Sequence, residues 1–469
     1  MPSVTVVSVT APSAVDAAIE LLAPDGIYLN GKWHLFYCMF HPDHAEGVAS
    51  SESAAGPFTG AREFPGCTQI DPSVFRDDDG TYYYTWGQFA MNMAKLKPDL
   101  SGLVEGSVRT NVIDEARHHF HEGSQLTKRN GIYYLTFADI SRKGRPTAIG
   151  YATATSAFGP YTYRGVIIDN AGCDPESWNN HGGIVEYKGR WYVFYHRPPR
   201  GFGNARQAIV APVKIEWDKK SVAEGGTVRI YGYDPYAKDN IWNAKDSQGN
   251  VYNGAEVTSE GFHIFGLDPY AYYSAGYACY MSNPQWMRDT WDWWDNNMDL
   301  AGINGGGIVG FKYFGFGGLS KASKGIKAFA GAQKGNQTKI NVFLTPHSDK
   351  AFSIDIMLDG PYANKVWNGK KIATINVPAG APQKSTKFVA DVAKAVEGLK
   401  GKHAIYLVAS NTGDGAPLFD LHGIAFSNKN KQFERTLPPT VDIKVNGKSL
   451  TIPTTPIRSN EQNGYCDVI

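Results

Sequence analysis

The chain of 469 residues lacks several features that would assign it to a class at once. Its formal net charge is only +1 and no basic cluster is visible, so neither a nucleic acid nor another polyanion is expected as a partner. No apolar run reaches the roughly 18 residues that a membrane-spanning helix needs. Long stretches with helical periodicity are nearly absent. These absences exclude a membrane span and favour an all-β chain.

Cysteine is also scarce, and the spacing of the cysteines matches no paired motif. The five cysteines are Cys38, Cys67, Cys173, Cys279 and Cys466, with no CxxC motif. We expect buried free thiols; one disulfide remains an alternative, and an odd count leaves at least one cysteine unpaired. The start, MPSVTVV, has neither the charged region nor the long apolar region of a secretory signal. The protein is therefore either cytoplasmic or begins downstream of a lost signal.

Aromatic residues make up 13% of the chain, alongside 51 glycines and 26 prolines, which suits many short strands and tight turns. Four times in the first half, a glycine precedes an aromatic-rich, alternating segment. The copies are residues 31–37 (GKWHLFY), 80–86 (GTYYYTW), 131–137 (GIYYLTF) and 189–195 (GRWYVFY). A β-rich unit that recurs about every 50 residues is typical of a β-propeller, and we count four blades.

The pattern changes along the chain and predicts four regions. Residues 1–218 form the propeller, and residues 219–261, rich in Gly, Asp, Asn and Tyr, form a connector. Residues 262–428 contain apolar strands separated by turns, which predicts a β-sandwich. Residues 429–469, with several prolines, are expected to be an exposed tail or the start of a truncated element.

Two acids stand beside the repeat in successive blades. Asp71 lies in IDPSVF (70–75) and Glu122 lies in HEGS (121–124). Because a propeller gathers the first strands of its blades around one axis, these residues are expected to meet. Glycoside hydrolysis needs two carboxyl groups, about 5–5.5 Å apart for retention or roughly 6.5–9.5 Å for inversion, and one must have a raised pKa. Taken alone, either acid is more often a turn residue or a solvated side chain.

Two further polar segments have alternative interpretations. DDDG (77–80) lacks the remaining ligands of a calcium loop, so we expect a hairpin turn there, as at Asn130-Gly131. The segment 174–183 contains Trp178 and His181 and could bind a sugar or hold an ion at the propeller axis. The alternative is a histidine satisfied by backbone partners.

Several ordered motifs resemble glycoside hydrolase family 43, the five-bladed propellers that trim arabinoxylan and related plant polysaccharides. They are residues 23–33, 47–58, 70–80, 122–135 and 180–196. The arabinoxylan arabinofuranohydrolases and β-xylosidases are the most similar members. The resemblance implies an enzyme, secreted or periplasmic, that removes arabinofuranosyl or xylosyl units from plant polysaccharide or oligosaccharide by acid-assisted inverting hydrolysis.

The resemblance also implies roles for individual residues. Glu122 would be the general acid, and Asp71 would tune its pKa and orient the substrate. His181 would lie near the axis, where members often hold a calcium ion, and would reach such an ion through water. Arg206 in the last blade would contact the sugar, with Trp178 and His181 as further substrate-binding residues. The resemblance implies no required cofactor and allows a structural calcium ion.

The chain departs from the family at its beginning. Members carry their general base, an aspartate, in a first blade upstream of the segment 23–33. Residues 1–22 show neither the Asp-Pro strand nor the glycine strand; Asp16 is a poor match, and Asp25 belongs to a different segment. We therefore expect a five-bladed-type propeller whose N-terminal blade is missing, with impaired catalysis. A non-catalytic carbohydrate-binding protein with a degenerate propeller and an incomplete gene model are the alternatives.

The C-terminal region resembles carbohydrate-binding module family 6, a jelly-roll sandwich. The matching segments are residues 307–316, 354–358, 401–408 and 418–420. The loop 286–294 supplies Trp291, Trp293 and Trp294, whose rings would suit stacking on sugars. Core packing is the alternative for these tryptophans.

Overall fold

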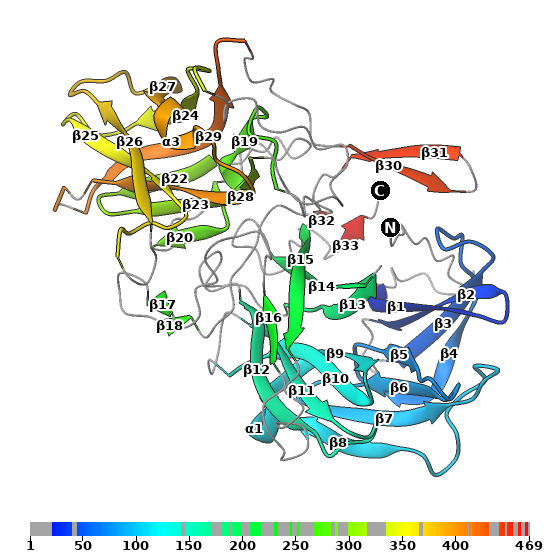
Figure 1. Cartoon of the computed structure of the whole chain (residues 1–469). Coiled ribbons are helices and arrows are strands. Elements are labelled where there is room, and N and C mark those ends of the chain that lie inside the picture. The colour runs from blue at the N-terminus through cyan, green and yellow to red at the C-terminus, as the bar shows by residue number, and fades with distance from the viewer. Residues whose placement is uncertain are drawn as a thin grey trace.

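The computed structural model describes twenty segments of the chain (Figure 1). They are residues 21–39, 45–141, 147–169, 180–187, 189–197, 207–216, 229–232, 244–245, 251–252, 266–282, 287–288, 299–316, 334–364, 369–410, 412–413, 415–430, 440–445, 448–453, 458–460 and 465–467. Antiparallel strands dominate, and α1 (Glu115–His118) and α3 (Ala393–Val396) are single turns, so the all-β prediction is confirmed. Within these segments no helix has the length and apolarity to cross a membrane.

The first sixteen strands form four sheets of four strands, each paired in chain order. The first sheet contains β1 (Leu21–Leu29), β2 (Lys32–Met39), β3 (Ala45–Ser51) and β4 (Thr59–Thr68). The second contains β5 (Ser73–Arg76), β6 (Tyr82–Trp86), β7 (Ala90–Leu96) and β8 (Arg109–Asp114). The third contains β9 (Phe120–Arg129), β10 (Ile132–Asp139), β11 (Ala148–Ala154) and β12 (Thr162–Asp169). The fourth contains β13 (Gly183–Tyr187), β14 (Arg190–Arg197), β15 (Gln207–Glu216) and β16 (Arg229–Gly232).

The second strand of every sheet is one of the predicted glycine strands, and the local turn chemistry explains why. Asn130 and Gly131 have φ of 50° and 78°, the left-handed values that a two-residue hairpin turn requires, and they join β9 to β10. At the DDDG segment the Asp77 backbone N–H donates to the Thr81 carbonyl and the Gly80 N–H to the Asp77 carbonyl. The predicted hairpin turn is confirmed there.

The first strands of successive sheets touch one another. β1 contacts β5, β5 contacts β9, and β9 contacts β13, although about fifty residues separate neighbours in sequence. In Figure 1 these four sheets, coloured blue to green, are grouped together at one end of the molecule. Residues that begin these strands are therefore brought close to residues of the neighbouring sheets.

Aromatic side chains fill the space between the sheets. Phe36 of β2, Phe64 of β4 and Tyr84 of β6 pack with ring centroids 4.9–5.5 Å apart and are fully buried. Each buried ring of this kind stabilises the fold by about 1.5–3 kcal/mol. The alternating aromatic pattern of the repeats thus becomes the contact between the first and second sheets.

A polar contact joins the second and third sheets. Asp77, at the end of β5, accepts hydrogen bonds from Lys128 Nζ of β9 and from the Tyr133 hydroxyl of β10, both at 2.5 Å. Burial raises the pKa of Asp77. These two bonds, together with the bond from the Asp78 N–H, lower it by more than burial raises it, so the net shift is downward. The ionised carboxylate therefore holds β5 against β9. Asp71 lies just before β5, and Glu122 lies in β9.

Two further antiparallel sheets follow from residue 273 onward and enclose a common apolar core. One contains β19 (Tyr273–Ser274), β21 (Met287–Arg288), β22 (Asp299–Asn304), β24 (Lys339–Pro346), β27 (Thr386–Asp391) and β29 (Pro417–Ser427). The other contains β20 (Tyr280–Ser282), β23 (Ile308–Gly315), β25 (Phe352–Leu358), β26 (Lys370–Val377) and β28 (Lys402–Ala409). Val342, Phe311 and Ile405 are among the side chains buried between them.

The predicted regions differ from the structure in two places. β16 pairs with β15, so the fourth sheet continues to Gly232, beyond the predicted boundary at residue 218. The region predicted as a tail contains paired strands, β30 (Thr440–Val445) with β31 (Lys448–Pro453) and β32 (Arg458–Asn460) with β33 (Tyr465–Asp467). In both places the strands are short and lack the aromatic-rich alternation of the repeats.

Three of the five cysteines agree with the prediction of buried free thiols. Cys38, Cys67 and Cys279 are buried and free. Cys173 and the side chain of Cys466 lie outside the part of the chain that the structure describes.

Candidate active site

Asp71 and Glu122 both lie where a first strand meets its neighbours. Asp71 comes just before β5, with a φ of 63° that non-glycine residues rarely adopt, and Glu122 lies near the start of β9. Each residue is only 6% exposed. Backbone strain of this kind, about 1–3 kcal/mol, persists only where the surroundings hold the residue in place, and it clusters at functional sites.

Glu122 has a raised pKa, and the causes can be named. Burial is the largest cause, and the negative charge of Asp71 raises the pKa further. Three neighbours oppose this: His121, the Gln88 side chain, whose Nε2 donates to Glu122 Oε2 at 2.8 Å, and His181. The influence of Asp71 on Glu122 places the two carboxyl groups within electrostatic reach of each other, in adjoining sheets.

His181 joins this site from the fourth sheet. It lies just before β13, and its backbone N–H donates to His196 Nε2 at 3.2 Å. Its ring lies so close to Gly123 that a Cβ atom there would come within 2.7–2.8 Å of three ring atoms. Gly123 also has a φ of 67°. Only glycine satisfies both conditions without strain, so the residue after Glu122 permits the approach of His181.

Asp25, in β1 of the first sheet, lies in the same region, and its carboxylate holds β1 against β5. Its Oδ2 accepts hydrogen bonds from the Ser73 hydroxyl at 2.9 Å and the Val74 N–H at 2.8 Å, and its Oδ1 accepts from the Gly26 N–H at 2.8 Å. Burial raises the pKa of Asp25, while these bonds and the charge of His181 lower it in part. The carboxylate thereby fastens β1 to the first residues of β5, two positions after Asp71.

A second carboxyl group near Asp71 is entirely buried. Glu46 of β3 is 0% exposed and accepts a hydrogen bond from the Tyr84 hydroxyl at 2.5 Å. Burial, and to a lesser extent the charge of Asp71, raise the pKa of Glu46 to about 8, although the Tyr84 bond opposes this. Glu46 is therefore mainly protonated at neutral pH.

Sequence reasoning missed Gln88, Glu46, and the pair formed by His121 and Glu115. Gln88 and Glu46 follow no recognisable motif, and only the packing of the sheets brings them to the acids. His121 directly precedes Glu122, and that adjacency was the one available signal. Five of the predicted site residues, Trp178, Arg206, Trp291, Trp293 and Trp294, lie outside the described residues.

The sequence predicts a structural calcium ion near His181. In the described segments, no three His, Cys, Asp or Glu side chains are grouped so that they could hold a metal ion. His181 packs against Gly123 on one side of its ring.

The site thus combines a buried carboxyl group whose pKa is raised with a second carboxylate that contributes to the shift. This is how an enzyme keeps a carboxylic acid protonated so that it can donate its proton to a leaving oxygen, as glycoside hydrolases do. This arrangement fits the acid-assisted hydrolysis of glycosides.

One protein-family model matches the first half of the chain. Residues 4–220 match the model of glycosyl hydrolases family 43. A β-xylosidase of Xylanibacter ruminicola is 29% identical over 219 residues, covering 38% of this chain and 65% of the relative. An arabinoxylan arabinofuranohydrolase of Bacillus subtilis (strain 168) is 28% identical over 426 residues, covering 82% of this chain and 71% of the relative.

The chain is also similar to solved structures. One is a β-xylosidase/α-arabinofuranosidase from a compost microbial metagenome, in complex with xylotriose and in a calcium-free form. It is 29% identical, with a TM-score of 0.38, and the match covers 45% of this chain and 74% of that one.

Proposed function

We propose that the chain is a glycoside hydrolase that removes arabinofuranosyl or xylosyl units from arabinoxylan-type polysaccharide or its oligosaccharides, by acid-assisted inverting hydrolysis. The observation that carries this proposal is the buried Glu122, whose pKa is raised by burial and by Asp71, in a segment that matches family 43. The names of the xylosidase and arabinofuranohydrolase relatives support the choice of sugars.

In the proposed reaction Glu122 donates its proton to the glycosidic oxygen as the bond to the departing group breaks. The charge of Asp71 raises the pKa of Glu122, which helps to keep the proton on Glu122 until the leaving oxygen takes it. His181 and Gln88 hold the acid from two sides. Among the described residues we assign no general base, since the carboxylate of Asp25 already accepts three protein hydrogen bonds.

The test compares hydrolysis of aryl α-L-arabinofuranosides and aryl β-D-xylosides with hydrolysis of xylobiose and arabinoxylan. Glu122→Gln should lower the rate on the natural linkages by about 10²–10⁴, because their leaving groups need the proton. The loss should be smaller on aryl glycosides, whose leaving groups depart unaided. Asp99→Asn, at an exposed turn aspartate, is the control with unchanged rate. Equal rates for Glu122→Gln and the wild type on arabinoxylan would refute the proposal.

The lack of an assigned base leads to a second expectation. The chain should act slowly, and external azide should raise the rate on aryl glycosides by attacking in place of activated water, with a glycosyl azide as product. If the chain is fully active without azide, another residue serves as base.

We propose further that the four N-terminal sheets are blades of a five-bladed-type propeller. The contacts of β1 with β5, β5 with β9 and β9 with β13 support this arrangement.

A structural calcium ion and secretion of the protein are further proposals drawn from the family. Calcium binding is tested by equilibrium dialysis of the whole chain, and secretion by finding the protein in the culture medium.

For the C-terminal sheets we propose a jelly-roll carbohydrate-binding module, supported by their common core. Affinity electrophoresis of the full chain in gels with and without xylan tests this. Retardation should weaken when Trp291, Trp293 or Trp294 is changed to Ala, by about 1 kcal/mol for a stacking ring. Equal mobility of the wild type with and without xylan would count against a module.

A further inference from the structure

His121 stands between two glutamates at the candidate active site. Its Nδ1 lies 2.8 Å from Glu115 Oε1, and its Nε2 lies 3.9 Å from Glu122 Oε2. The His121 side chain is 5% exposed, whereas Glu115 is 36% exposed and therefore open to solvent. A carboxylate that accepts the Nδ1–H of a histidine fixes the orientation of the ring. The other ring nitrogen then faces Glu122.

The backbone around His121 holds this geometry. The Phe89 N–H donates to the His121 carbonyl at 2.7 Å, and the Glu115 N–H donates to the Phe89 carbonyl at 3.1 Å. The Phe89 ring also packs edge-on against the imidazole, with centroids 5.4 Å apart. Phe89 lies in the β6–β7 connection, directly after Gln88, which bonds Glu122. One short loop thus holds both the histidine and the acid.

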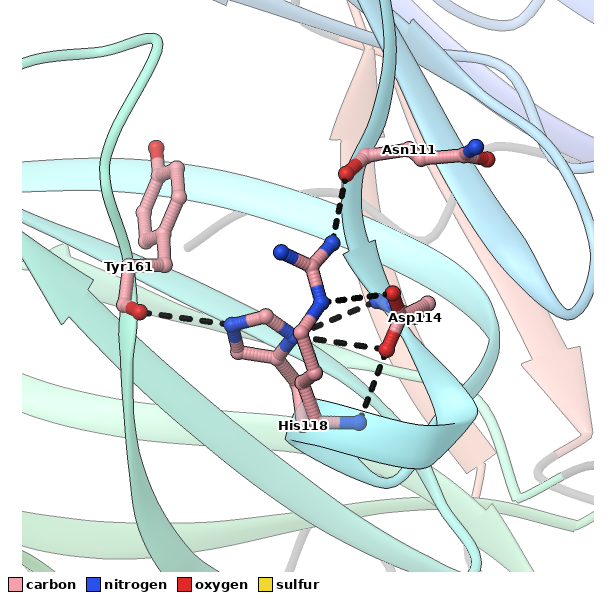
Figure 2. A network of polar contacts seen from close by, with 5 residues as sticks. Asn111, Asp114, His118 and Tyr161 are labelled. Atoms are coloured by element: carbon pink, nitrogen blue, oxygen red, sulfur yellow. Dashed lines mark hydrogen bonds and ion pairs between the residues drawn. The ribbon is translucent and has the colours of Figure 1, made fainter.

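Glu115 is the first residue of α1, and the other residues of this turn contact Asp114 and Tyr161 rather than Glu122. Asp114 caps the helix by accepting the Arg117 N–H at 2.8 Å. Figure 2 shows His118 of the same turn joined to Asp114 and to the Tyr161 carbonyl, which is 3.3 Å from His118 Nε2. His118 is a buried histidine beside an acid, as His121 is, but no contact in this network reaches Glu122. It therefore offers a matched control.

We propose that Glu115 and His121 form a positioning pair that orients Glu122 and biases it electrostatically toward releasing its proton. This role rests on the proposed function, since it serves the acid step of that hydrolysis. Asp71 and the Glu115–His121 pair would then act on Glu122 in opposite directions. Asp71 favours the protonated form of Glu122, and His121 favours its carboxylate.

The charged and titratable groups that face Glu122 give the expected signs. They are Asp71 before β5, His121 on β9 and His181 before β13. Removing the positive charge of His121 should raise the pKa of Glu122, because the anion loses a favourable neighbour. Removing Asp71 should lower it. Removing the charge of Glu115 should act like removing His121, but more weakly, since the imidazole stays in place but loses the carboxylate that orients it.

The experiment measures kcat/KM against pH on an aryl arabinofuranoside and an aryl xyloside. It compares wild type with His121→Asn, Glu115→Gln, Asp71→Asn and His118→Gln. The loss of activity at alkaline pH, which follows deprotonation of Glu122, should move upward in His121→Asn and Glu115→Gln. It should move downward in Asp71→Asn and stay in place in His118→Gln. Glu115→Asp, which keeps the charge, should restore the wild-type profile. KM should change less than kcat throughout.

A second measurement separates this proposal from the proposed function. NMR of the full chain with ¹³C-labelled glutamate carboxyls follows the titration of Glu122 directly, and the Glu122→Gln variant identifies its signal. The same directions of shift are expected, whether or not a sugar is cleaved. An inactive wild type with shifted titrations would refute the hydrolase and retain the pair. Unshifted titration in both His121→Asn and Glu115→Gln, in variants that melt cooperatively, would overturn the pair.

Discussion

The carboxylate of Asp25 accepts the hydroxyl of Ser73 at 2.9 Å, across the contact between the first two sheets. It also accepts the N–H of Val74, so one side chain positions the strand that begins directly after Asp71–Pro72. Asp25 in β1 thus fixes the backbone at the start of β5, two residues after Asp71.

Changing Asp25 tests whether it is an anchor. Asp25→Ala should destabilise the fold by about 1–3 kcal/mol, because it leaves the Ser73 and Val74 donors unsatisfied. Asp25→Asn, which keeps an acceptor oxygen, should lose less stability and retain most of the activity. Urea unfolding and aryl glycoside hydrolysis measure the two effects. If Asp25 were the general base, Asp25→Asn would be inactive and azide would rescue it.

Gly123→Ala should disturb the site through His181. The new methyl group would overlap the imidazole and would require a left-handed backbone, which costs an L-residue about 1–2 kcal/mol by itself. Gly131→Ala is the matched control, because Gly131 has a similar φ of 78° but open space around it. We expect both variants to lose stability in thermal unfolding, and only Gly123→Ala to lose activity strongly. Equal activities would show that His181 tolerates displacement.

The contact of Asp77 with Lys128 and Tyr133 should make the fold sensitive to acid. Because the pKa of Asp77 is lowered in the folded state, its contribution is present above the ordinary value of 3.8 and is lost as pH falls through the folded value. Asp77→Asn should cost about 3 kcal/mol at pH 7, since it leaves Lys128 without its main partner. Denaturant unfolding at pH 7 and at acid pH measures both effects. The variant should lose less stability on acidification than the wild type.

Glu46 should have the opposite dependence on pH. Its folded pKa of about 8 lies above the ordinary value of 4.5, so folding favours the protonated form. The stabilisation is complete below the ordinary value and declines as pH rises toward the folded value. Glu46→Gln keeps the shape without the charge and should flatten this decline, with the difference from wild type largest above pH 8. An identical slope of unfolding free energy against pH in both proteins would refute the buried neutral glutamate.

The regular elements of the first half follow from local sequence alone. Alternating aromatic strands after Asn-Gly or Asp-Gly turns specify hairpins, because side chains two apart share one face of a strand and only certain residues adopt a left-handed turn. The places of Asp71 and Glu122 at the starts of strands follow from the same pattern. The acid pair could therefore be predicted before any coordinates were known.

What the tertiary structure alone decided is the electrical environment of those acids. Burial raises the pKa of Glu122 and of Glu46, and burial depends on how whole sheets close over a side chain. Gln88 and Glu115 reach the site through contacts between separate sheets and loops, and Asp25 becomes an anchor only because β1 lies against β5. Hydrogen-bonding patterns repeat along a strand and can be recognised in its sequence. Desolvation is a property of everything that surrounds a group in space, which no single segment encodes.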